Sequence, residues 1–287
     1  MLLYISCLRK FDSFDVIKIN LLNRNKILEF IPCYSKIFNI KIFNIIDSTN
    51  NYLLNKFDKS EYNNNLIVVA ASEIQFNGRG RENRKWYGGT LGNTLTFSIL
   101  WRFEKGVSSL SGLSLVIGIV LVRVLRSFSD SNIYLKWPND ILHDNSKLAG
   151  ILVELRGKIH GPSFAVIGIG INFHLPFSIK SHIQQKVTDL FQCTGKVHDR
   201  NEILGALLVQ LYIVLSDFEK YGFSYFKNEW MSYHAYQGKN VTLLFPHNKS
   251  VVGVVDDVND DGSICLITPN GKQSYNTGNI SMRLKNN

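Results

Sequence analysis

The sequence predicts an α/β fold of the α+β type, in which helices pack against a sheet and a small β-domain follows. Two observations lead to this prediction. Up to about residue 235, apolar runs of strand length are interspersed with segments of helical periodicity. Beyond it, short strands follow at close spacing between Asn, Asp, Gly and Pro turns, which is typical of a small all-β barrel. We therefore expect an N-terminal extension (1–36), a main domain (37–235) and a C-terminal domain (236–287).

The elements of the main domain follow in order. Short polar residues at 47–49 separate an apolar strand from the helix that they cap. The Val- and Ala-rich run at 66–73 is typical of a buried strand, and the apolar run at 112–125 of a helix buried on nearly all sides. Asp199 and Glu202 form a capping box for a long amphipathic helix. Further elements are expected as strands at 93–101, 132–137, 148–155 and 163–173, with 132–137 and 148–155 as hairpin partners, and as a helix at 224–233.

Composition limits the kind of partner and site. The chain carries 32 Lys and Arg against 23 Asp and Glu, a formal net charge of +9, which favours anionic partners. Much of the lysine lies in Asn- and Ile-rich segments, so we attribute the larger share of this charge to base composition. The four cysteines are scattered, without a CxxC pair or metal-ligand spacing. We therefore expect neither a disulfide framework nor a metal site.

The sequence also argues against a membrane or secreted protein. Its most apolar run, at 112–125, is interrupted by Arg123 and is too short to cross a bilayer. The basic residues near Met1 follow the apolar run there, which is the wrong polarity for a secretory signal. We therefore expect a cytoplasmic protein.

The connection between the first two buried strands is the strongest functional signal. It runs from 74 to 92, beyond the ~12–15 residues above which loops without a function become uncommon. Its segment EIQFNGRGRENRKW, which starts at residue 73, places Arg79 and Arg81 among glycines, so that guanidinium and backbone N–H groups can converge on one anion. Trp86 closes the segment and can stack on a base. A solvated loop is the alternative, but the full GRGRxxRKW pattern argues against it.

Three further motifs lie at strand ends. In KWPND (136–140), Asn139 and Asp140 either satisfy their own backbone in a tight turn or face a ligand. Lys147 directly precedes a buried strand, which places it better than an ordinary exposed lysine to point into a site. GIGIN (168–172) lacks the third glycine and the following helix of a dinucleotide fingerprint, so we expect its glycines to let a ligand or strand pack closely. The implied chemistry is electrostatic, with cations gathered around a polyanion.

In this order, the motifs resemble those of the biotin protein ligases. The resemblance extends from about residue 40 to the C-terminus and is carried by DSTN (47–50), EIQFNGRGRENRKW (73–86), KWPNDI (136–141), KLAGILVE (147–154) and VIGIGIN (166–172). It implies a class II synthetase-like catalytic domain with a mixed, largely antiparallel sheet, followed by an SH3-like barrel.

The resemblance also implies a two-step reaction. Biotin attacks the α-phosphate of ATP, bound with Mg²⁺, to give biotinyl-5′-AMP, and a lysine of the biotin carboxyl carrier protein of acetyl-CoA carboxylase then accepts the biotinyl group. The catalytic residues implied are Lys147, Arg79 and Arg81. The biotin-binding residues implied are Ser48, Thr49, Asn50, Gln75, Gly78, Arg79, Gly80, Arg81, Lys147 and Gly150. The adenylate-binding residues implied are Arg79, Arg81, Trp86, Asn139, Asp140, Lys147 and Asn172.

Two features depart from the family pattern. Asn83 replaces the usual third loop glycine, and because Asn tolerates left-handed conformations we expect a stiffer but working loop. Residues 1–36 are too few for the DNA-binding domain of bifunctional relatives, so we expect a monofunctional enzyme, with DNA an unlikely partner. A lipoate or octanoyl ligase of the same fold and a biotin-responsive transcriptional regulator are the alternatives. The sequence leaves a monomer and a homodimer open.

Overall fold

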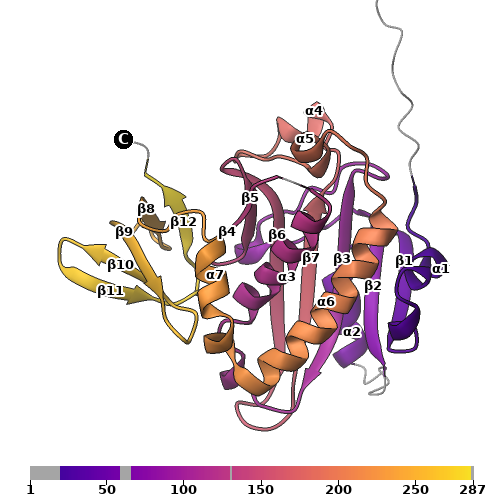
Figure 1. The fold of residues 1–287 in the computed structure, drawn as a ribbon, viewed down its shortest axis with the longest axis horizontal. Coiled ribbons are helices and arrows are strands. Elements are labelled where there is room, and N and C mark those ends of the chain that lie inside the picture. Colours follow the sequence, from indigo (N-terminus) through magenta and orange to yellow (C-terminus); the bar gives the residue numbers. More distant parts are fainter. Residues whose placement is uncertain (1–19, 59–65, 130, 286–287) are drawn as a thin grey trace, which may run out of the picture.

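The computed structural model describes residues 20–58, 66–129 and 131–285. A seven-stranded sheet in the order β1-β2-β3-β7-β6-β5-β4 forms the centre of the molecule (Figure 1). Its strands are β1 (Phe38–Ile46), β2 (Ile67–Gln75), β3 (Thr94–Phe103), β4 (Ile133–Lys136), β5 (Asp140–His143), β6 (Ser146–Gly157) and β7 (Ser163–Asn172). Strands β1 and β2 run parallel, and every other neighbouring pair in this sheet is antiparallel. The mixed, largely antiparallel sheet is thereby confirmed.

One hairpin prediction was wrong. Residues 132–137 do not pair with 148–155; β4 pairs with β5, and β5 pairs with β6. The four residues of β5 begin directly after the turn at Pro138 and Asn139, so the segment is too short to show a strand period and its turn residues mask its start. Other short elements were not predicted either, among them α1 (Arg24–Glu29), α4 (Phe177–Lys180), α5 (Leu190–Thr194) and β12 (Ser281–Leu284).

Helices cover both faces of the main sheet (Figure 1). Helix α2 (Thr49–Asp58) covers one face. Helices α3 (Leu113–Ser127), α6 (Arg200–Tyr221) and α7 (Lys227–Tyr233) lie on the opposite side. Because side chains alternate along a strand, Phe97 and Ile99 of β3 join the large core beneath α3 and α6, whereas Leu100 packs with α2. The α3 face is thus a continuous apolar core, and α3 itself is buried on nearly all sides, as predicted.

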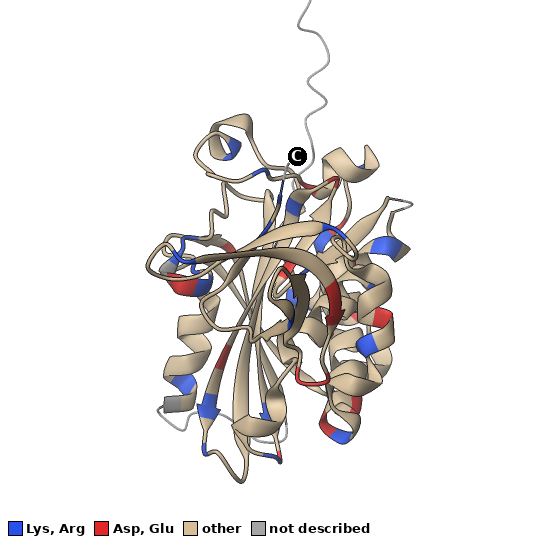
Figure 2. Ribbon diagram, turned by 90° about the vertical axis from the view of Figure 1, so that its left-hand side faces the viewer, with Lys and Arg blue, Asp and Glu red and all other residues tan. Residues whose placement is uncertain are grey.

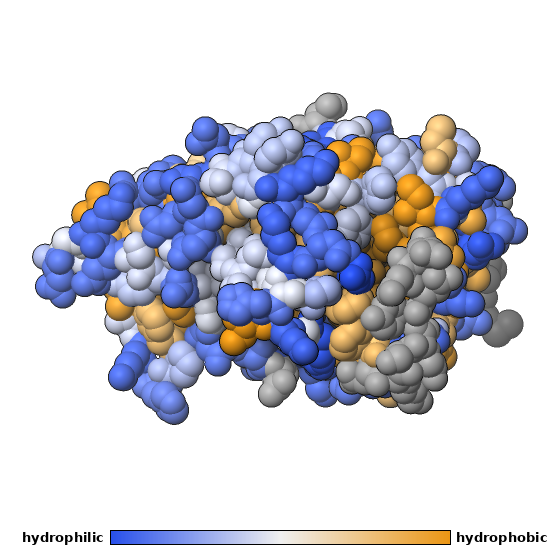
Figure 3. Space-filling view, turned by 90° about the horizontal axis from the view of Figure 1, so that it is seen from below, coloured by the Kyte–Doolittle hydropathy of each residue, from blue (hydrophilic) through white to orange (hydrophobic). Residues whose placement is uncertain are grey.

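Among the described helices, α6 is long and apolar enough to cross a membrane, with a hydropathy of 1.4. Its Leu-rich face, however, packs in the core, and the Asp199 side chain caps its start by accepting the Asn201 N–H at 2.8 Å. This helix therefore has the position of a core helix. The surface seen from below is mostly hydrophilic, with apolar side chains in separate patches (Figure 3). Basic and acidic residues are interspersed along the ribbon (Figure 2).

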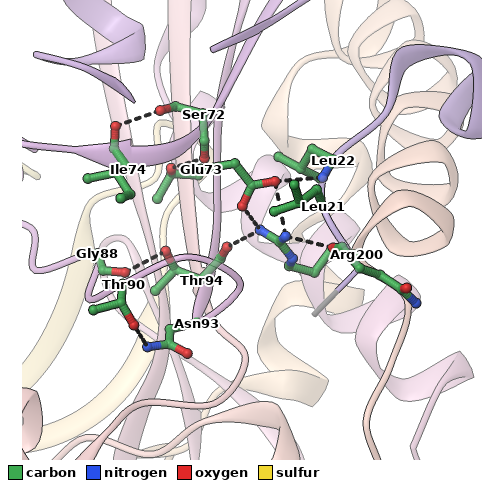
Figure 4. A network of polar contacts seen from close by, with 12 residues as sticks. Leu21, Leu22, Ser72, Glu73, Ile74, Gly88, Thr90, Asn93, Thr94 and Arg200 are labelled. Atoms are coloured by element: carbon green, nitrogen blue, oxygen red, sulfur yellow. Dashed lines mark hydrogen bonds and ion pairs between the residues drawn. The ribbon is translucent and has the colours of Figure 1, made fainter. Parts of the chain in front are cut away.

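A buried ion pair holds the N-terminal segment on the main domain (Figure 4). Arg200 Nη1 lies 2.8 Å from Glu73 Oε2, and both side chains are almost fully buried. Glu73 also accepts the Leu22 N–H at 2.6 Å, and Arg200 donates to the Asn20 carbonyl at 2.7 Å and the Thr94 carbonyl at 3.0 Å. Residues 20–36, which include α1 (Arg24–Glu29), are therefore ordered against this domain. The rest of the expected N-terminal extension, residues 1–19, lies outside the described residues.

The C-terminal residues form an antiparallel five-stranded sheet in the order β11-β10-β9-β8-β12. Besides β12, its strands are β8 (Asn240–Leu244), β9 (Ser250–Val258), β10 (Ile264–Thr268) and β11 (Gly271–Tyr275). This arrangement is compatible with the expected SH3-like domain. The fully buried Trp137 donates its indole N–H to the Gly262 carbonyl at 3.0 Å, which ties the turn before β5 to this sheet.

Candidate functional site

A cavity of about 410 Å³ lies on the α2 face of the main sheet. Strands β3, β6 and β7 form its floor, and the start of α2, the loop after β2 and the residues around β12 form its walls. The predicted site residues that line it are Ser48, Thr49, Asn50, Gln75, Arg79, Gly80, Arg81, Trp86, Asn139, Asp140, Lys147, Gly150 and Asn172. Gly78 belongs to the covering loop. The fold therefore brings the separate motifs together around one cavity.

The covering loop, residues 78–86, folds as a narrow hairpin. Gly80 donates its N–H to the Arg84 carbonyl at 2.7 Å, and Trp86 donates its N–H to the Gly78 carbonyl at 2.9 Å. A Cβ on Gly78 would lie 2.7 Å from the Trp86 carbonyl oxygen, so the narrow hairpin requires glycine there. At the tip, the left-handed residue is Glu82, with φ 57°. The expectation about Asn83 concerns a side chain outside the described residues.

The Trp86 ring rests on a floor of glycines. A Cβ on Gly170 would lie 2.5 Å from ring atoms of Trp86, and one on Gly150 would lie 3.4 Å from the ring. The Lys147 ammonium lies 5.8 Å from the ring centroid. The indole N–H is buried and has no hydrogen-bond partner among the described residues. The glycines thus let the Trp86 ring of the covering loop pack closely on the sheet, where the sequence predicted close packing of a ligand or a strand.

The start of α2 supplies a polar cluster at one end of the cavity. Ser48, Thr49 and Asn50 are almost fully buried. The Thr49 N–H donates to Gln75 Oε1 at 2.7 Å, and the Thr49 hydroxyl lies 2.6 Å from the Ser98 hydroxyl. Ser98 donates in turn to Asn50 Oδ1 at 2.5 Å. A Cβ at the neighbouring position 168 would lie 2.2 Å from Asn50 Oδ1, so a glycine there is required for this cluster.

Cations gather at the other end, around Asp140. Lys147 Nζ lies 2.7 Å from Asp140 Oδ1, and Lys136 Nζ lies 2.7 Å from Oδ2. Burial opposes ionisation of this carboxyl, but the two ammonium groups outweigh burial and hold the pKa of Asp140 below its ordinary value. Burial lowers the pKa of Lys136, against the attraction of the same carboxylate. The Asp140 carboxylate therefore holds the side chains of both lysines in place in one wall of the cavity.

A β-bulge directs Lys147 into the cavity. Ile141 of β5 pairs with Ala149 of β6, but the next residue of β5 pairs with Lys147. The skipped residue brings the lysine to the side of Gly150, where an added Cβ would lie 3.1 Å from Lys147 Nζ.

The two loop arginines are held by different parts of the protein. Arg79 forms an ion pair of 2.6 Å with Glu154 of β6. Arg81 donates to Asn139 Oδ1 at 3.1 Å and also to the carbonyls of Thr277 and Gly278 in the C-terminal domain. Burial lowers the pKa of the Arg81 guanidinium, and the charged side chains nearby change the size of this lowering. Loop, sheet and C-terminal domain therefore meet at the cationic end of the cavity, an arrangement that suits a carboxylate and a phosphate held side by side.

Known proteins are similar to this chain over most of its length. A family model described as the biotin/lipoate A/B protein ligase family matches residues 42–172, and one described as the biotin protein ligase C terminal domain matches residues 236–283. The chain is 36% identical over 245 residues to the bifunctional ligase/repressor BirA of Salmonella typhimurium, covering 85% of this chain and 74% of that protein. The chain belongs to the biotin protein ligase family.

Two other similarities agree with this assignment. A biotin–[acetyl-CoA-carboxylase] ligase of Paracoccus denitrificans is 27% identical over 216 residues, or 69% of this chain and 83% of that protein. The structure of the biotin protein ligase from Aquifex aeolicus in complex with biotin and ATP matches with a TM-score of 0.72 and 28% identity, over 86% of this chain and 99% of that chain. As a member of this ligase family, the chain is an enzyme of the ligase class.

In this member of the biotin protein ligase family, two predicted site residues, Asn172 and Asn139, also form hydrogen bonds with the backbone. Asn172 donates its amide to the Thr188 carbonyl at 2.9 Å and the Lys147 carbonyl at 3.3 Å. Asn139 donates to the Ile151 carbonyl at 2.8 Å, while its oxygen accepts from Arg81. Both amides therefore fix the strands that carry the site, in addition to lining the cavity.

Sequence reasoning did not single out several residues that the fold brings to the site. Glu154 and Lys136 lie within the motifs and Ser98 lies in the strand at 93–101, but each has a side chain that is unremarkable in sequence. Alternation from Gly150 along β6 would have placed Glu154 on the cavity face. Thr277 and Gly278 contribute backbone carbonyls, for which no side-chain signal exists.

Proposed function

We propose that this chain is an ATP-dependent biotin protein ligase that forms biotinyl-5′-AMP and transfers the biotinyl group to a lysine of a carrier protein. The observation that carries the proposal is the cavity itself, which has a polar cluster at one end and a cluster of lysines and arginines at the other. Biotin has a matching polarity, with a polar bicyclic head and a carboxylate tail.

The head group of biotin would bind at the start of α2. Thr49, Asn50 and Gln75 offer hydroxyl and amide groups that suit the N–H and C=O groups of a cyclic urea. Ser48 and the glycines of the floor complete this end of the cavity. The carboxylate tail would then extend toward Lys147.

Adenylation would take place beside Lys147. A carboxylate oxygen of biotin would form a bond to the α-phosphorus of MgATP, the bond between that phosphorus and the oxygen bridging to the β-phosphate would break, and pyrophosphate would leave. Lys147, Arg79 and Arg81 would stabilise the negative charge that grows on the phosphate oxygens. Trp86 and Asn139 would bound the adenylate side, and the loop would keep water from the anhydride.

In the second step, the neutral amine of an acceptor lysine attacks the anhydride carbonyl and an amide bond forms. The bond between the carbonyl carbon and the phosphate oxygen breaks, AMP leaves, and the proton lost by the amine passes to solvent. The acceptor proposed is the biotin carboxyl carrier protein of acetyl-CoA carboxylase. The name of the P. denitrificans relative supports this choice.

An intact-mass measurement tests the proposal. An apo biotin carrier domain is incubated with the protein, MgATP, and either biotin or lipoate. We expect one biotin adduct that requires ATP, and no lipoyl adduct. A lipoyl adduct alone would favour the lipoate ligase, the second candidate, because the matching family includes both kinds of enzyme.

A role as a DNA-binding regulator is not part of the proposal, although several relatives are named ligase/repressor. Residues 20–36 pack against the catalytic domain through α1 and through contacts with the Glu73–Arg200 pair. We expect the 287-residue chain to stay cytoplasmic and to show no salt-dependent binding to operator DNA. Sedimentation with and without biotin and ATP would distinguish a monomer from a homodimer.

A further inference from the structure

Glu154 lies beside the cavity and contacts both the polar cluster at the start of α2 and the covering loop. It lies on β6, four residues beyond Gly150, so that strand alternation turns it to the cavity face. Its oxygen Oε2 accepts from Asn50 Nδ2 at 2.8 Å and from Arg79 Nη2 at 2.6 Å. One carboxylate oxygen therefore links the polar cluster at the start of α2 to the cationic loop.

The charge of Glu154 decides the direction of the neighbouring hydrogen bonds. A carboxylate accepts hydrogen bonds and donates none. Asn50 must therefore turn its NH₂ group to Glu154 and its oxygen to Ser98, which donates to that oxygen at 2.5 Å. Since this bond uses the single hydroxyl proton of Ser98, the 2.6 Å contact between Ser98 and Thr49 requires Thr49 to be the donor.

These hydrogen bonds form a row in which Thr49 donates to Ser98, Ser98 to Asn50, and Asn50 to Glu154. The direction of this row determines which hydrogen-bonding groups the cavity offers to a ligand. The single Thr49 hydroxyl proton has two acceptors within reach, Ser98 Oγ at 2.6 Å and Gln75 Oε1 at 3.2 Å; with the proton given to Ser98, at the shorter distance, the hydroxyl presents lone pairs and can only accept from a ligand. Gln75 accepts the Thr49 N–H through Oε1, so its NH₂ group is the part left to donate. An acceptor beside a donor matches the N–H and C=O groups of a cyclic urea.

We propose that Glu154 is a positioning residue for biotin. It orients Asn50, Ser98 and Thr49 so that Thr49 accepts from the ligand, and it holds Arg79 at the edge of the same site. This inference rests on the proposed function, because biotin is the ligand whose N–H groups need the acceptor.

The test compares Glu154→Gln with Ser98→Ala and with the double variant. An amide can donate as well as accept, so Glu154→Gln lets Asn50 turn over and the row reverse, whereas Ser98→Ala interrupts the row and leaves the ion pair with Arg79 intact. We expect each single variant to weaken the binding of biotin alone, measured by calorimetry, by ~10-fold or more. The double variant should bind biotin no more weakly than the weaker single variant, because both changes break one row.

Two further variants separate positioning from general damage. Glu154→Asp keeps an acceptor-only carboxylate and should bind biotin more tightly than Glu154→Gln. Glu104→Gln makes the same substitution in an exposed ion pair with Arg102 and should bind biotin as the wild type does.

Several outcomes would overturn the inference: wild-type biotin affinity in Glu154→Gln, equal losses in the Asp and Gln variants, or additive losses in the double variant. If Glu154→Gln fails to fold, wild-type biotin affinity in Ser98→Ala would overturn the inference instead. A wild-type protein that binds biotin but makes no adduct would instead contradict the proposed function, and the comparison of biotin affinities would still test the role of Glu154.

Discussion

The ammonium nitrogen of Lys147 lies 2.7 Å from Asp140 Oδ1, so the lysine proposed to act on biotin and ATP is held by a buried carboxylate. The second oxygen of Asp140 is paired with Lys136. A phosphate that enters the cavity therefore meets a lysine that Asp140 already holds in place. When Lys147 turns to the ligand, the Asp140 carboxylate keeps its ion pair with Lys136.

Replacing this lysine should remove catalysis without removing the fold. In Lys147→Ala, Asp140 keeps its bond to Lys136, so we expect a folded protein. The loss of one preorganised cation should lower the rate of adenylate formation by ~10²-fold or more. Biotin-dependent release of pyrophosphate measures this rate, and the exposed lysine variant Lys272→Ala is the matched control. A wild-type rate in Lys147→Ala would remove the residue from the mechanism.

Asp140 should make the stability of the protein depend on acid. Its pKa lies below the ordinary 3.8 because the two ammonium groups outweigh the effect of burial. A depressed carboxyl pKa contributes stability that is present above the ordinary value and is lost as the pH falls toward the native one. We expect the melting temperature to fall below about pH 4, and to fall less steeply in Asp140→Asn. This expectation would be contradicted if the melting temperatures of the two proteins fell by the same amount between pH 5 and 3.

Gly168 should be required for biotin binding. An alanine there would place its Cβ 2.2 Å from Asn50 Oδ1 and displace the polar cluster. We expect Gly168→Ala to weaken biotin binding by ~10-fold or more, since at least one hydrogen bond of the cluster is lost. Gly88→Ala is the matched control, because a Cβ there would meet only the Thr94 hydroxyl at 3.5 Å. Calorimetry with biotin measures both, and unchanged affinity in Gly168→Ala would show that Asn50 can move without consequence.

Arg81 should slow the escape of biotinyl-5′-AMP. It joins the loop to Asn139 and to two carbonyls of the C-terminal domain. Because bonds to charged groups contribute ~1.5–3 kcal/mol, we expect Arg81→Ala to release the adenylate ~10–100-fold faster. Release of labelled adenylate in a chase experiment measures the rate, and Arg24→Ala, an exposed position on α1, is the control. An unchanged release rate would contradict a closing role for this loop.

The Glu73–Arg200 pair should be among the most costly in the protein to break. Glu73→Gln would leave Arg200 buried without a charged partner and weaken the anchor of residues 20–22 (Figure 4). We expect a loss of ~3–5 kcal/mol in the free energy of unfolding. Chemical denaturation measures this loss, and Glu104→Gln, in an exposed pair, should change stability by only ~0–1 kcal/mol. Similar small changes in both variants would show that the pair is not a structural anchor.

Sequence reasoning succeeded where the signal was local. The alternating run of β3 and the capped helix after residue 47 were predicted because a period or a cap is complete within a few residues. The hairpin of β4 failed for the opposite reason. Its partner β5 has only four residues, and pairing across a turn is decided by neighbouring strands rather than by its own sequence.

By itself, the sequence determined the order of the main elements, the motifs and the cationic character of the loop, since these are properties of residue type and spacing. Only the tertiary structure decided which groups meet those motifs. Glu154 reaches both Asn50 and Arg79, and the turn at 277–278 reaches Arg81, because sheet register and the packing of the C-terminal domain bring them there. The physical reason is that such contacts join residues far apart in the chain, and no local pattern encodes their distance.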